Sequence, residues 1–304
     1  MSDSVGVIFI THAAKHHLPH CLPPFINSPL KPKVLVVNSS SHDGTVELAE
    51  KMGAHTLVIP RPQFNHGTSR ESARCYLSTD IVVMMTPDAY AVDQDVLEKL
   101  IHPLLTKTAS VAYARQIPHH GAGVLEAFPR AFNYPEHVER RSIADVERLG
   151  IYTFFCSNAC AAYRNAALDE VGGFDPVLFG EDTVAVAKLL RRGHTLHYAA
   201  DAVVHHSHAY TLLQEFKRHF DIGLSRKSYF HLFEGAGSDK ARGWTYARQL
   251  LCKTKSPYTL LHLFSKWCGY QFGSRSLNAP DWLKKHLSSQ DFYWVSEEYL
   301  RTKC

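Results

Sequence analysis

Residues 34–44 read Val-Leu-Val-Val-Asn-Ser-Ser-Ser-His-Asp-Gly, an apolar run followed at once by a polar cluster. A continuous apolar run of this length is typical of a strand that is covered on both faces of a parallel sheet, and the polar cluster is typical of a loop. Residues 45–52 then have helical spacing and are followed by Gly53, a common helix terminator. Strand, polar loop and helix in this order predict one unit of an α/β fold, with the loop at the carboxyl end of its strand.

The same alternation continues on both sides of this unit. Residues 5–10 and 81–85 predict two more buried strands, residues 56–59 a shorter one, and residues 70–77 a helix. Strands that alternate with helices predict a mostly parallel α/β sheet with right-handed crossovers. Ligands of such sheets bind beyond the carboxyl ends of the strands. Three polar clusters occur there, namely Thr11-His12, Ser39 to Asp43, and Asp88.

The second half of the chain is less regular. Residues 118–142 mix proline, histidine, glycine and aromatic residues, and they predict a long loop with short helices. Residues 153–155 and 159–163 predict strands. The pattern further along predicts a helix over residues 182–192, a strand over residues 195–204 and a helix over residues 212–229.

Length and composition narrow the class of protein. The 304 residues are enough for one large domain or two modest ones, and the 45% hydrophobic and 20% charged residues argue against long disordered segments. The apolar runs fall far short of the roughly 20 residues of a membrane-spanning helix, and residues 1–4 lack the features of a signal peptide. The 7 cysteines include no Cys-x-x-Cys pair, which favours free thiols in a reducing cytoplasm over a disulfide framework or a zinc site.

Charge is distributed unevenly along the chain. From Gly235 to the end there are 11 lysine or arginine residues against 5 aspartate or glutamate residues, a net charge of +6, whereas the rest of the chain carries −2. This basic tail is also rich in aromatic residues, but it shows no nucleic-acid recognition motif, so we expect no nucleic-acid partner. Two interpretations remain. The tail is either a helical subdomain packed on the body, or a peripheral docking segment for anionic lipids on the inner face of the cytoplasmic membrane.

Two acidic motifs have the residue types that catalysis needs. Asp88 follows an apolar strand, where a carboxylate can hold Mg²⁺ or Mn²⁺ against a diphosphate; the alternative is an Asp that caps a turn or helix. Glu181 and Asp182 open a predicted helix, where an acid can act as general base toward a hydroxyl nucleophile or merely complement the helix dipole. The residues alone leave both alternatives open for each motif.

Histidines and basic residues follow the last predicted strand. His205, His206 and His208 can ligate a metal or donate to a phosphate, or they are structural. Lys217 and Arg218 can clamp a diphosphate, or they lie on a solvated helix face. The chain has no Walker loop, no Gly-x-Gly-x-x-Gly and no Gly-x-Ser-x-Gly, so neither a P-loop, a dinucleotide-binding fold nor a hydrolase nucleophile elbow is supported.

Taken in order, these motifs resemble the inverting glycosyltransferases of family 2, which have the GT-A fold. The matching pieces are Val-Ile-Phe-Ile-Thr11, Val-Val-Asn38-Ser-Ser-Ser-His-Asp43-Gly-Thr45, Thr86-Pro-Asp88-Ala and Gly180-Glu-Asp182. A tighter resemblance, over nearly the whole chain, is to the bacterial rhamnosyltransferases of O-antigen and related polysaccharide assembly. Its pieces are Phe64-Asn-His-Gly67 with Arg70, Ala114 to Pro118, Phe132 to Pro135, Phe155 to Arg164, His206 to Thr211, Gln214 to Gly223 and Cys268 to Gly273.

The resemblance implies a GT-A catalytic domain over residues 1–232 and a basic helical extension over residues 233–304. Two positions depart from the family's pattern. Asn38 replaces the first acidic residue of the nucleotide loop, so contact with the base is expected through an amide. Thr86-Pro-Asp88 retains one carboxylate of the family's Asp-x-Asp motif. A histidine, the diphosphate and water are therefore expected to complete the coordination of a metal.

The function that the resemblance implies is transfer of a deoxysugar, L-rhamnose from dTDP-β-L-rhamnose, to a hydroxyl of a lipid-linked glycan with inversion to an α-linkage. Asp182 would be the general base, with Glu181 the next candidate, and Asp88, His206 and His208 would hold Mg²⁺ or Mn²⁺. Two alternatives are the same fold with a UDP-hexose donor and a catalytically silent partner subunit. The other expected site residues contact the donor (Thr11, Asn38, Ser40, Asp43, Arg70, Asp88, Lys217 and Arg218) or the acceptor (Asn158 and residues 118–135).

Overall fold

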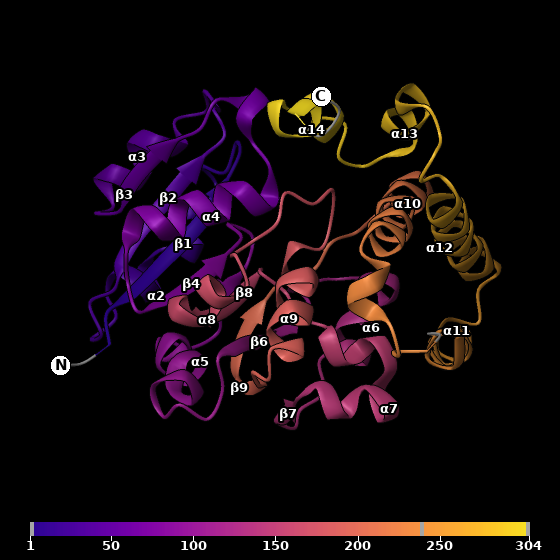
Figure 1. The fold of residues 1–304 in the computed structure, drawn as a ribbon, viewed down its shortest axis with the longest axis horizontal. Helices are drawn as coiled ribbons and strands as arrows, with labels where there is room; N and C mark the ends of the chain where they lie inside the picture. Colours follow the sequence, from indigo (N-terminus) through magenta and orange to yellow (C-terminus); the bar gives the residue numbers. More distant parts are fainter. Residues whose placement is uncertain (1–2, 238–239, 302–304) are drawn as a thin grey trace.

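One mixed sheet forms the centre of the computed structural model, which describes residues 3–237 and 240–301 (Figure 1). The strands found in these residues are β1 (Val5–Thr11), β2 (Lys33–Asn38), β3 (His55–Val58), β4 (Ile81–Met85), β5 (Tyr90–Ala91), β6 (Val111–Ile117), β7 (Glu139–Arg141), β8 (Cys160–Arg164) and β9 (Leu196–His205). Their order across the sheet is β3-β2-β1-β4-β8-β6-β9-β5, and β7 pairs with β9. The four strands predicted in the first half of the sequence are all present.

The first half of the sheet is parallel, as the sequence predicts. β1 pairs in parallel with β2 and β4, and β2 pairs in parallel with β3. Every residue of β1 and β4 is buried because helices cover both faces of the sheet. On one face Val7 and Phe9 pack with α1 (Leu18–Cys21), α2 (Pro23–Ile26), α3 (Thr45–Lys51) and α5 (Val96–Leu105). On the other face Ile8 and Ile10 pack with α4 (His66–Leu77), α8 (Asn165–Glu170) and α9 (Glu181–Arg191).

The second half of the sheet mixes directions. β8 lies antiparallel between β4 and β6, and β6 pairs in parallel with β9. The predicted strands over residues 159–163 and 195–204 are confirmed as β8 and β9. Residues 118–142, predicted to form a long loop with short helices, contain one ten-residue helix, α6 (Val124–Asn133), and also the short strand β7, which was not predicted. The helical turns η2 (Ile143–Asp145) and α7 (Val146–Leu149) follow this segment.

The prediction of a strand over residues 153–155 is wrong. Thr153 and Phe154 belong to a 3₁₀-helix, η3 (Gly150–Phe154), and both are buried. The Phe154 ring packs 5.7 Å from the ring of Phe233, in η4 (Phe230–Phe233). A three-residue apolar run can be buried equally well by packing in a helical turn, so its sequence pattern does not distinguish the two structures.

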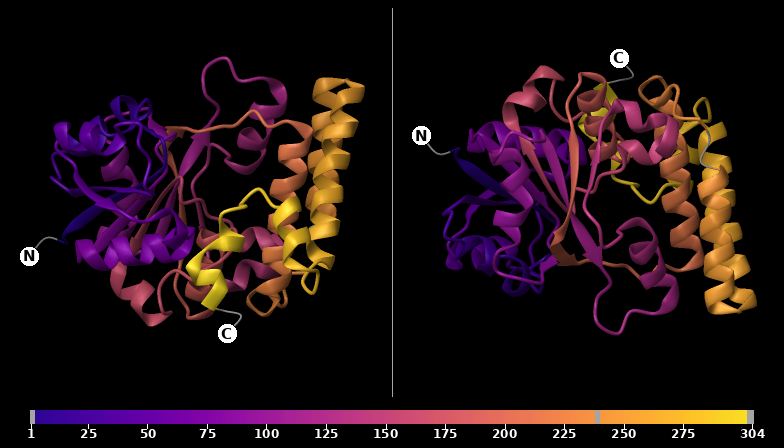
Figure 2. Two further views of the ribbon diagram at one scale, coloured as in Figure 1. Left: turned by 90° about the horizontal axis from the view of Figure 1, so that it is seen from above. Right: turned by 90° about the horizontal axis from the view of Figure 1, so that it is seen from below.

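The remaining helices form a layer beside the sheet. α10 (Leu212–Ser228) lies next to α12 (Pro257–Arg275), and Figure 2 shows α12 as the outermost helix with α10 between it and the sheet. Glycines permit this close packing: a Cβ at Gly269 would lie 2.2 Å from the carbonyl oxygen of Phe216, and a Cβ at Gly273 would lie 1.9 Å from that of Phe220. α11 (Lys240–Thr254) precedes α12 in the chain.

The end of the described chain returns to the N-terminal half. After α13 (Asp281–Leu287), the segment through η5 (Tyr293–Val295) and α14 (Glu297–Arg301) passes close to η1 (Arg61–Gln63) (Figure 1). The Phe292 ring lies 5.5 Å from the ring of Phe64 and beneath the guanidinium of Arg61 at 4.3 Å. Residues of the basic extension therefore pack against the part of the chain that carries the polar clusters.

Candidate active site

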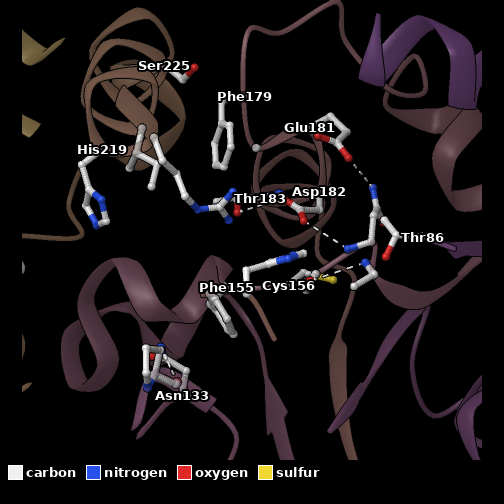
Figure 3. A pocket seen from close by; sticks show the side chains of 18 of the residues that line it. Thr86, Asn133, Phe155, Cys156, Phe179, Glu181, Asp182, Thr183, His219 and Ser225 are labelled. Atoms are coloured by element: carbon white, nitrogen blue, oxygen red, sulfur yellow. Dashed lines mark hydrogen bonds between the residues drawn. The ribbon is translucent and has the colours of Figure 1, made fainter. Parts of the chain in front are cut away.

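A cavity of about 550 Å³ lies between the carboxyl end of β4, the start of α9, the end of β9 and the inner face of α10 (Figure 3). Its size is in the range of ligand-binding pockets in proteins. Most of the predicted site residues line it, although they come from distant parts of the sequence. These residues are Arg70, Asp88, Asn158, Glu181, Asp182, His206, His208 and Arg218.

Asp182 lies in the first turn of α9, directly beside the cavity (Figure 3). Gly180 precedes the helix with a left-handed backbone (φ 79°), which turns the chain so that both acids enter the first turn. The Oδ2 atom of Asp182 accepts a hydrogen bond from the backbone N–H of Asn158 at 3.1 Å, and its Oδ1 atom accepts one from the N–H of Thr183 at 2.6 Å. Burial and the neighbouring charge of Glu181 raise the pKa of Asp182 to about 6. A carboxylate with this pKa can accept a proton near neutral pH.

Glu181 is occupied by partners within the protein. Its Oε1 atom lies 3.1 Å from Nη1 of Arg70 and accepts a hydrogen bond from Nδ2 of Asn158 at 3.1 Å. Burial opposes ionisation of Glu181, but the charges of Arg70 and His66 outweigh it and lower the pKa of the carboxyl. The two neighbouring acids thus have different environments. That of Glu181 lowers its pKa and keeps it ionised, whereas that of Asp182 raises its pKa toward neutral pH.

Asn158 connects the two acids. Its backbone N–H binds Asp182, its side-chain amide donates to Glu181, and its Oδ1 atom accepts a hydrogen bond from the Tyr163 hydroxyl at 2.8 Å. The residue is buried. This arrangement uses its polar groups to position the acids and leaves little of the side chain for contact with a bound molecule. Arg70, also buried, is likewise directed at Glu181.

Asp88, His206 and His208 form a group with the spacing of metal ligands. The ligand atoms of the three side chains all lie within 4.8 Å of one another, and Oδ2 of Asp88 is 3.4 Å from Nε2 of His206 and 3.3 Å from Nε2 of His208. Burial opposes ionisation of Asp88, but hydrogen bonding and charge from His206 and His208 hold its pKa well below the usual range. Burial lowers the pKa of His206, and burial with the charge of His206 lowers that of His208 to about 4, so both imidazoles are neutral at pH 7.

A second layer orients His206. Its Nδ1 atom lies 2.9 Å from Oε1 of Gln116, and Nε2 of Gln116 donates to the Ser157 hydroxyl at 2.9 Å. Gln116 thereby fixes the orientation of the His206 ring, and the other ring nitrogen, Nε2, faces Asp88. Such support is typical of histidines that bind metals. His205, by contrast, turns its Nδ1 toward the carbonyl oxygen of Pro118 at 2.8 Å and does not line the cavity.

Several residues that line the cavity do not belong to a recognisable sequence motif, so the sequence analysis did not select them as site residues. Arg130, in α6, lines the cavity within the segment that the sequence assigned to the acceptor. Arg218, which was predicted, lies over the ring of Phe179 at 4.8 Å and over that of Tyr210 at 5.5 Å, whereas its neighbour Lys217 does not line the cavity. The other unpredicted lining residues include His66, Tyr210, Glu215, His219, Lys266 and Gln290, the last two from the extension.

The predicted nucleotide-loop residues lie at the ends of β1 and β2, outside the lining of this cavity. Asp43 accepts hydrogen bonds from the hydroxyls of Ser41 (2.8 Å) and Thr45 (2.6 Å), and these hold its pKa below the usual range against the opposing effect of burial. The Asn38 amide, fully buried, donates to the hydroxyls of Ser41 (2.8 Å) and Thr11 (3.3 Å). The loop is therefore held in shape by the residues predicted to touch a nucleotide.

Ser40 takes part in the same loop. Its hydroxyl donates to the carbonyl oxygen of Ile59 at 2.9 Å, and its backbone is left-handed (φ 53°). Next to it, the Ser39 hydroxyl lies 3.0 Å from Nδ1 of His12 and accepts a hydrogen bond from Nη1 of Arg61 at 3.1 Å. The polar groups that follow β1 and β2 thus meet at the carboxyl edge of the sheet, as the sequence predicted, and Arg61 of η1, which was not predicted there, joins them.

A second cavity, of about 490 Å³, adjoins the first. Both cavities are lined by Leu125, Glu126, His208, Tyr210 and Glu215. The remaining wall of the second cavity comes from residues 123–124, Ala209 and the junction of α11 with α12, namely Lys253, Thr254, Ser256, Tyr258, Thr259 and His262.

His262 is one of three buried polar residues that line this second cavity, with Thr259 and Glu215. It is 2% exposed, and among the described residues neither of its ring nitrogens has a hydrogen-bond partner. The nearest carboxylate oxygen of Glu215 lies 3.6 Å from its Nε2. A buried imidazole needs hydrogen-bond partners, and its place in the wall of the second cavity makes it accessible to a molecule bound there.

Comparison with known proteins gives a consistent set of relatives. Residues 26–221 match a family described as "Glycosyltransferase like family 2". The chain is 34% identical over 285 residues to the O-antigen chain rhamnosyltransferase RfbN of Salmonella typhimurium and 33% identical over 284 residues to the O-antigen chain rhamnosyltransferase WbaN of Salmonella anatum, covering 89% of both chains in each case. Among solved structures, it is similar to a mannosyltransferase from Pyrobaculum calidifontis in complex with GDP-Man and Mn²⁺, with a TM-score of 0.62, 15% identity, and coverage of 100% of this chain and 89% of that one.

Proposed function

Because the chain belongs to glycosyltransferase family 2, has the GT-A fold and is a glycosyltransferase, we propose that it transfers L-rhamnose from dTDP-β-L-rhamnose to a hydroxyl of a lipid-linked glycan in O-antigen assembly. The names of the two curated relatives support the sugar and the pathway. The observation that carries the proposal is the cavity in which Asp182, with a pKa of about 6, shares one space with the Asp88–His206–His208 group.

Asp182 acts as the general base in this proposal. It takes the proton of the acceptor hydroxyl while the oxygen attacks the anomeric carbon from the face opposite the departing dTDP, so the configuration inverts from β to α. Proton transfer in the transition state is worth about 10²–10⁴ in rate. Glu181 is held by Arg70 and Asn158, and its role is to position Asn158, and through it Asp182.

Asp88, His206 and His208 fit a divalent cation. The set offers one anionic oxygen and two neutral imidazole nitrogens, and Gln116 has already oriented one of the imidazoles. A mixed oxygen and nitrogen set favours Mn²⁺ over Mg²⁺, which prefers oxygen ligands and water. When bound, such an ion neutralises charge that develops on the departing diphosphate.

Two guanidinium groups supply further positive charge. Arg130 and Arg218 both line the cavity, and the rings of Phe179 and Tyr210 keep Arg218 in place. A planar guanidinium binds phosphate oxygens in a bidentate manner. The base of the nucleotide then lies toward the loop of residues 38–43, which its own hydrogen bonds hold in shape.

The second cavity is the acceptor site in this proposal. It opens into the first beside Glu126, His208 and Glu215, so a sugar held there can present a hydroxyl to the donor. Carboxylates, hydroxyls and aromatic rings are the groups that bind neutral sugars, since they accept or donate hydrogen bonds and cover apolar sugar faces. His262 would bind an acceptor hydroxyl, which replaces the role first expected of Asn158.

Hydrolysis of a panel of donors tests the proposed function without any knowledge of the acceptor. The full chain is incubated with Mn²⁺ and, separately, with dTDP-L-rhamnose, UDP-glucose, UDP-galactose or GDP-mannose, and release of the nucleoside diphosphate is measured. We expect dTDP-L-rhamnose to be cleaved at least about tenfold faster than the others. Preference for a UDP-hexose would refute the assigned donor, and cleavage of none of them would refute catalysis.

A further inference from the structure

Helix α12 presents its apolar side to solvent. Phe264 and Trp267, whose rings are 6.0 Å apart, are 61% and 59% exposed, and three further large apolar side chains of the same helix are more than half exposed. The side that faces α10 instead carries small and polar residues. The exposed set is Leu260, Leu261, Phe264, Trp267 and Phe272, and the buried set is Thr259, His262, Gly269 and Gly273.

The spacing of these residues makes one continuous stripe. At 3.6 residues per turn, the exposed set covers an arc of about 140°, and the buried set lies on the opposite side of the helix. A helix on the surface of a globular protein ordinarily has the reverse arrangement. Single exposed apolar residues are common, but a contiguous patch of this kind marks an interaction surface. Packing on α10 does not explain it, since glycines mediate that contact.

The net charge of the segment that carries the stripe favours an anionic partner. Residues 240–280 contain 7 lysine or arginine residues and no aspartate or glutamate. Five of these cations are exposed: Lys240, Arg248, Lys253, Lys255 and Arg275. A second copy of this chain would bring two positive surfaces together, which is unfavourable, whereas an anionic lipid surface complements both the cations and the aromatic rings.

We propose that α12 docks in the plane of an anionic membrane, with the stripe of residues 260, 261, 264, 267 and 272 inserted at the level of the lipid headgroups. Among the described helices none meets the length and hydropathy that a membrane span requires. The second cavity is bounded by Tyr258, Thr259 and His262 at the N-terminal end of α12. Docking would therefore bring the acceptor site beside the bilayer, a consequence that rests on the proposed function.

Co-sedimentation of the full chain with vesicles tests the docking directly. The protein is mixed, without donor, with vesicles of phosphatidylcholine alone or of phosphatidylcholine with phosphatidylglycerol, at low and at high salt. We expect the chain to pellet with the anionic vesicles at low salt and to be released by salt, because screening weakens the attraction of exposed charges. A chain that stays in the supernatant under every condition would overturn the proposal.

Paired variants locate the contact. Phe264→Ser with Trp267→Ser should weaken binding to anionic vesicles about tenfold or more, since the apolar area available for insertion is lost. Tyr76→Ser is the matched control, because Tyr76 is 62% exposed but lies on α4, away from α12. Equal binding of the double variant and the wild type would refute the assignment to α12. If the wild type is a dimer and the double variant is a monomer, the membrane proposal would also be refuted, because the stripe would then contact a second copy of this chain.

The vesicle experiment and the donor panel can fail separately. Vesicle binding is measured without donor, and donor hydrolysis is measured without vesicles, so each result bears on one proposal alone. We expect the double variant to hydrolyse the donor at the wild-type rate, which also shows that it is folded. Loss of donor hydrolysis in that variant would contradict a docking role confined to the outer face of α12.

Discussion

Replacing Asp182 with asparagine removes the proposed general base and keeps a side chain of nearly the same size. Asp182 has an ordinary pKa of 3.8, which its environment raises to about 6. At pH 7 about nine molecules in ten carry the ionised form, ready to accept a proton. The asparagine cannot do so, and we expect transfer to fall by about 10²–10⁴-fold, the usual scale for loss of a general base.

The fold should survive this change. Because the pKa is raised in the folded state, ionisation of Asp182 opposes folding; the cost grows between pH 3.8 and about pH 6 and stays at about 3 kcal/mol at higher pH. The asparagine removes that cost. Its NH₂ group, however, must face the backbone N–H of either Asn158 or Thr183, which costs about 1–3 kcal/mol. The two effects nearly cancel, so the melting temperature should change by a few degrees at most.

The assay follows transfer of labelled rhamnose from dTDP-L-rhamnose to a membrane extract that contains the lipid-linked acceptor. Wild type and Asp182→Asn are compared with Asp201→Asn, an exposed carboxylate on β9. Wild-type kcat/KM should fall about tenfold per pH unit below pH 6, because the base must be deprotonated. Near-normal turnover of Asp182→Asn, with an unchanged pH profile, would refute the assignment of the base.

Four further predictions follow from the contacts described above. Asp88→Asn should abolish the dependence of activity on added Mn²⁺ and weaken binding of Mn²⁺, as measured by calorimetry on the protein alone. Gln116→Leu, which frees His206 to rotate, should lower Mn²⁺ affinity about 10–100-fold without change in the fold. Gly273→Ala places a Cβ 1.9 Å from a carbonyl oxygen of α10 and should destabilise the protein by about 1–3 kcal/mol, seen in urea unfolding. His262→Phe should raise the KM for the acceptor while donor hydrolysis stays at the wild-type rate; equal effects on both would contradict an acceptor role.

The sequence was most informative where local patterns decide the structure. The apolar runs at residues 5–10, 34–37 and 81–85 are strands of the sheet. Helices cover both faces of the sheet there, so consecutive residues are buried, and an uninterrupted apolar run is the sequence pattern of such a strand. Asp88 and Asp182 were recognised because each follows a clear local signal, the end of a strand and the start of a helix. The rule that ligands bind at the carboxyl edge of such sheets applied to Asp88, whereas the expected role of Asp182, 94 positions further along, came from the resemblance to the family; the structure places both residues in the lining of one cavity.

Other features depend on contacts between distant segments and were not visible in the sequence. The antiparallel insertion of β8 between β4 and β6 is one, since a short apolar run does not show its direction. The role of Asn158 depends on how β8 and α9 meet, so its use as a link between two acids could not be read from its neighbours. Lys266 and Gln290 reach the cavity only because the extension folds back onto the body.

The anomeric configuration of the newly formed linkage tests the central claim most directly. Wild-type enzyme is supplied with dTDP-β-L-rhamnose and the lipid-linked acceptor, and the glycan product is analysed by nuclear magnetic resonance for the configuration at the anomeric carbon of the added rhamnose. A single displacement assisted by Asp182 predicts an α-linkage. A β-linkage would show retention of configuration and would contradict the mechanism.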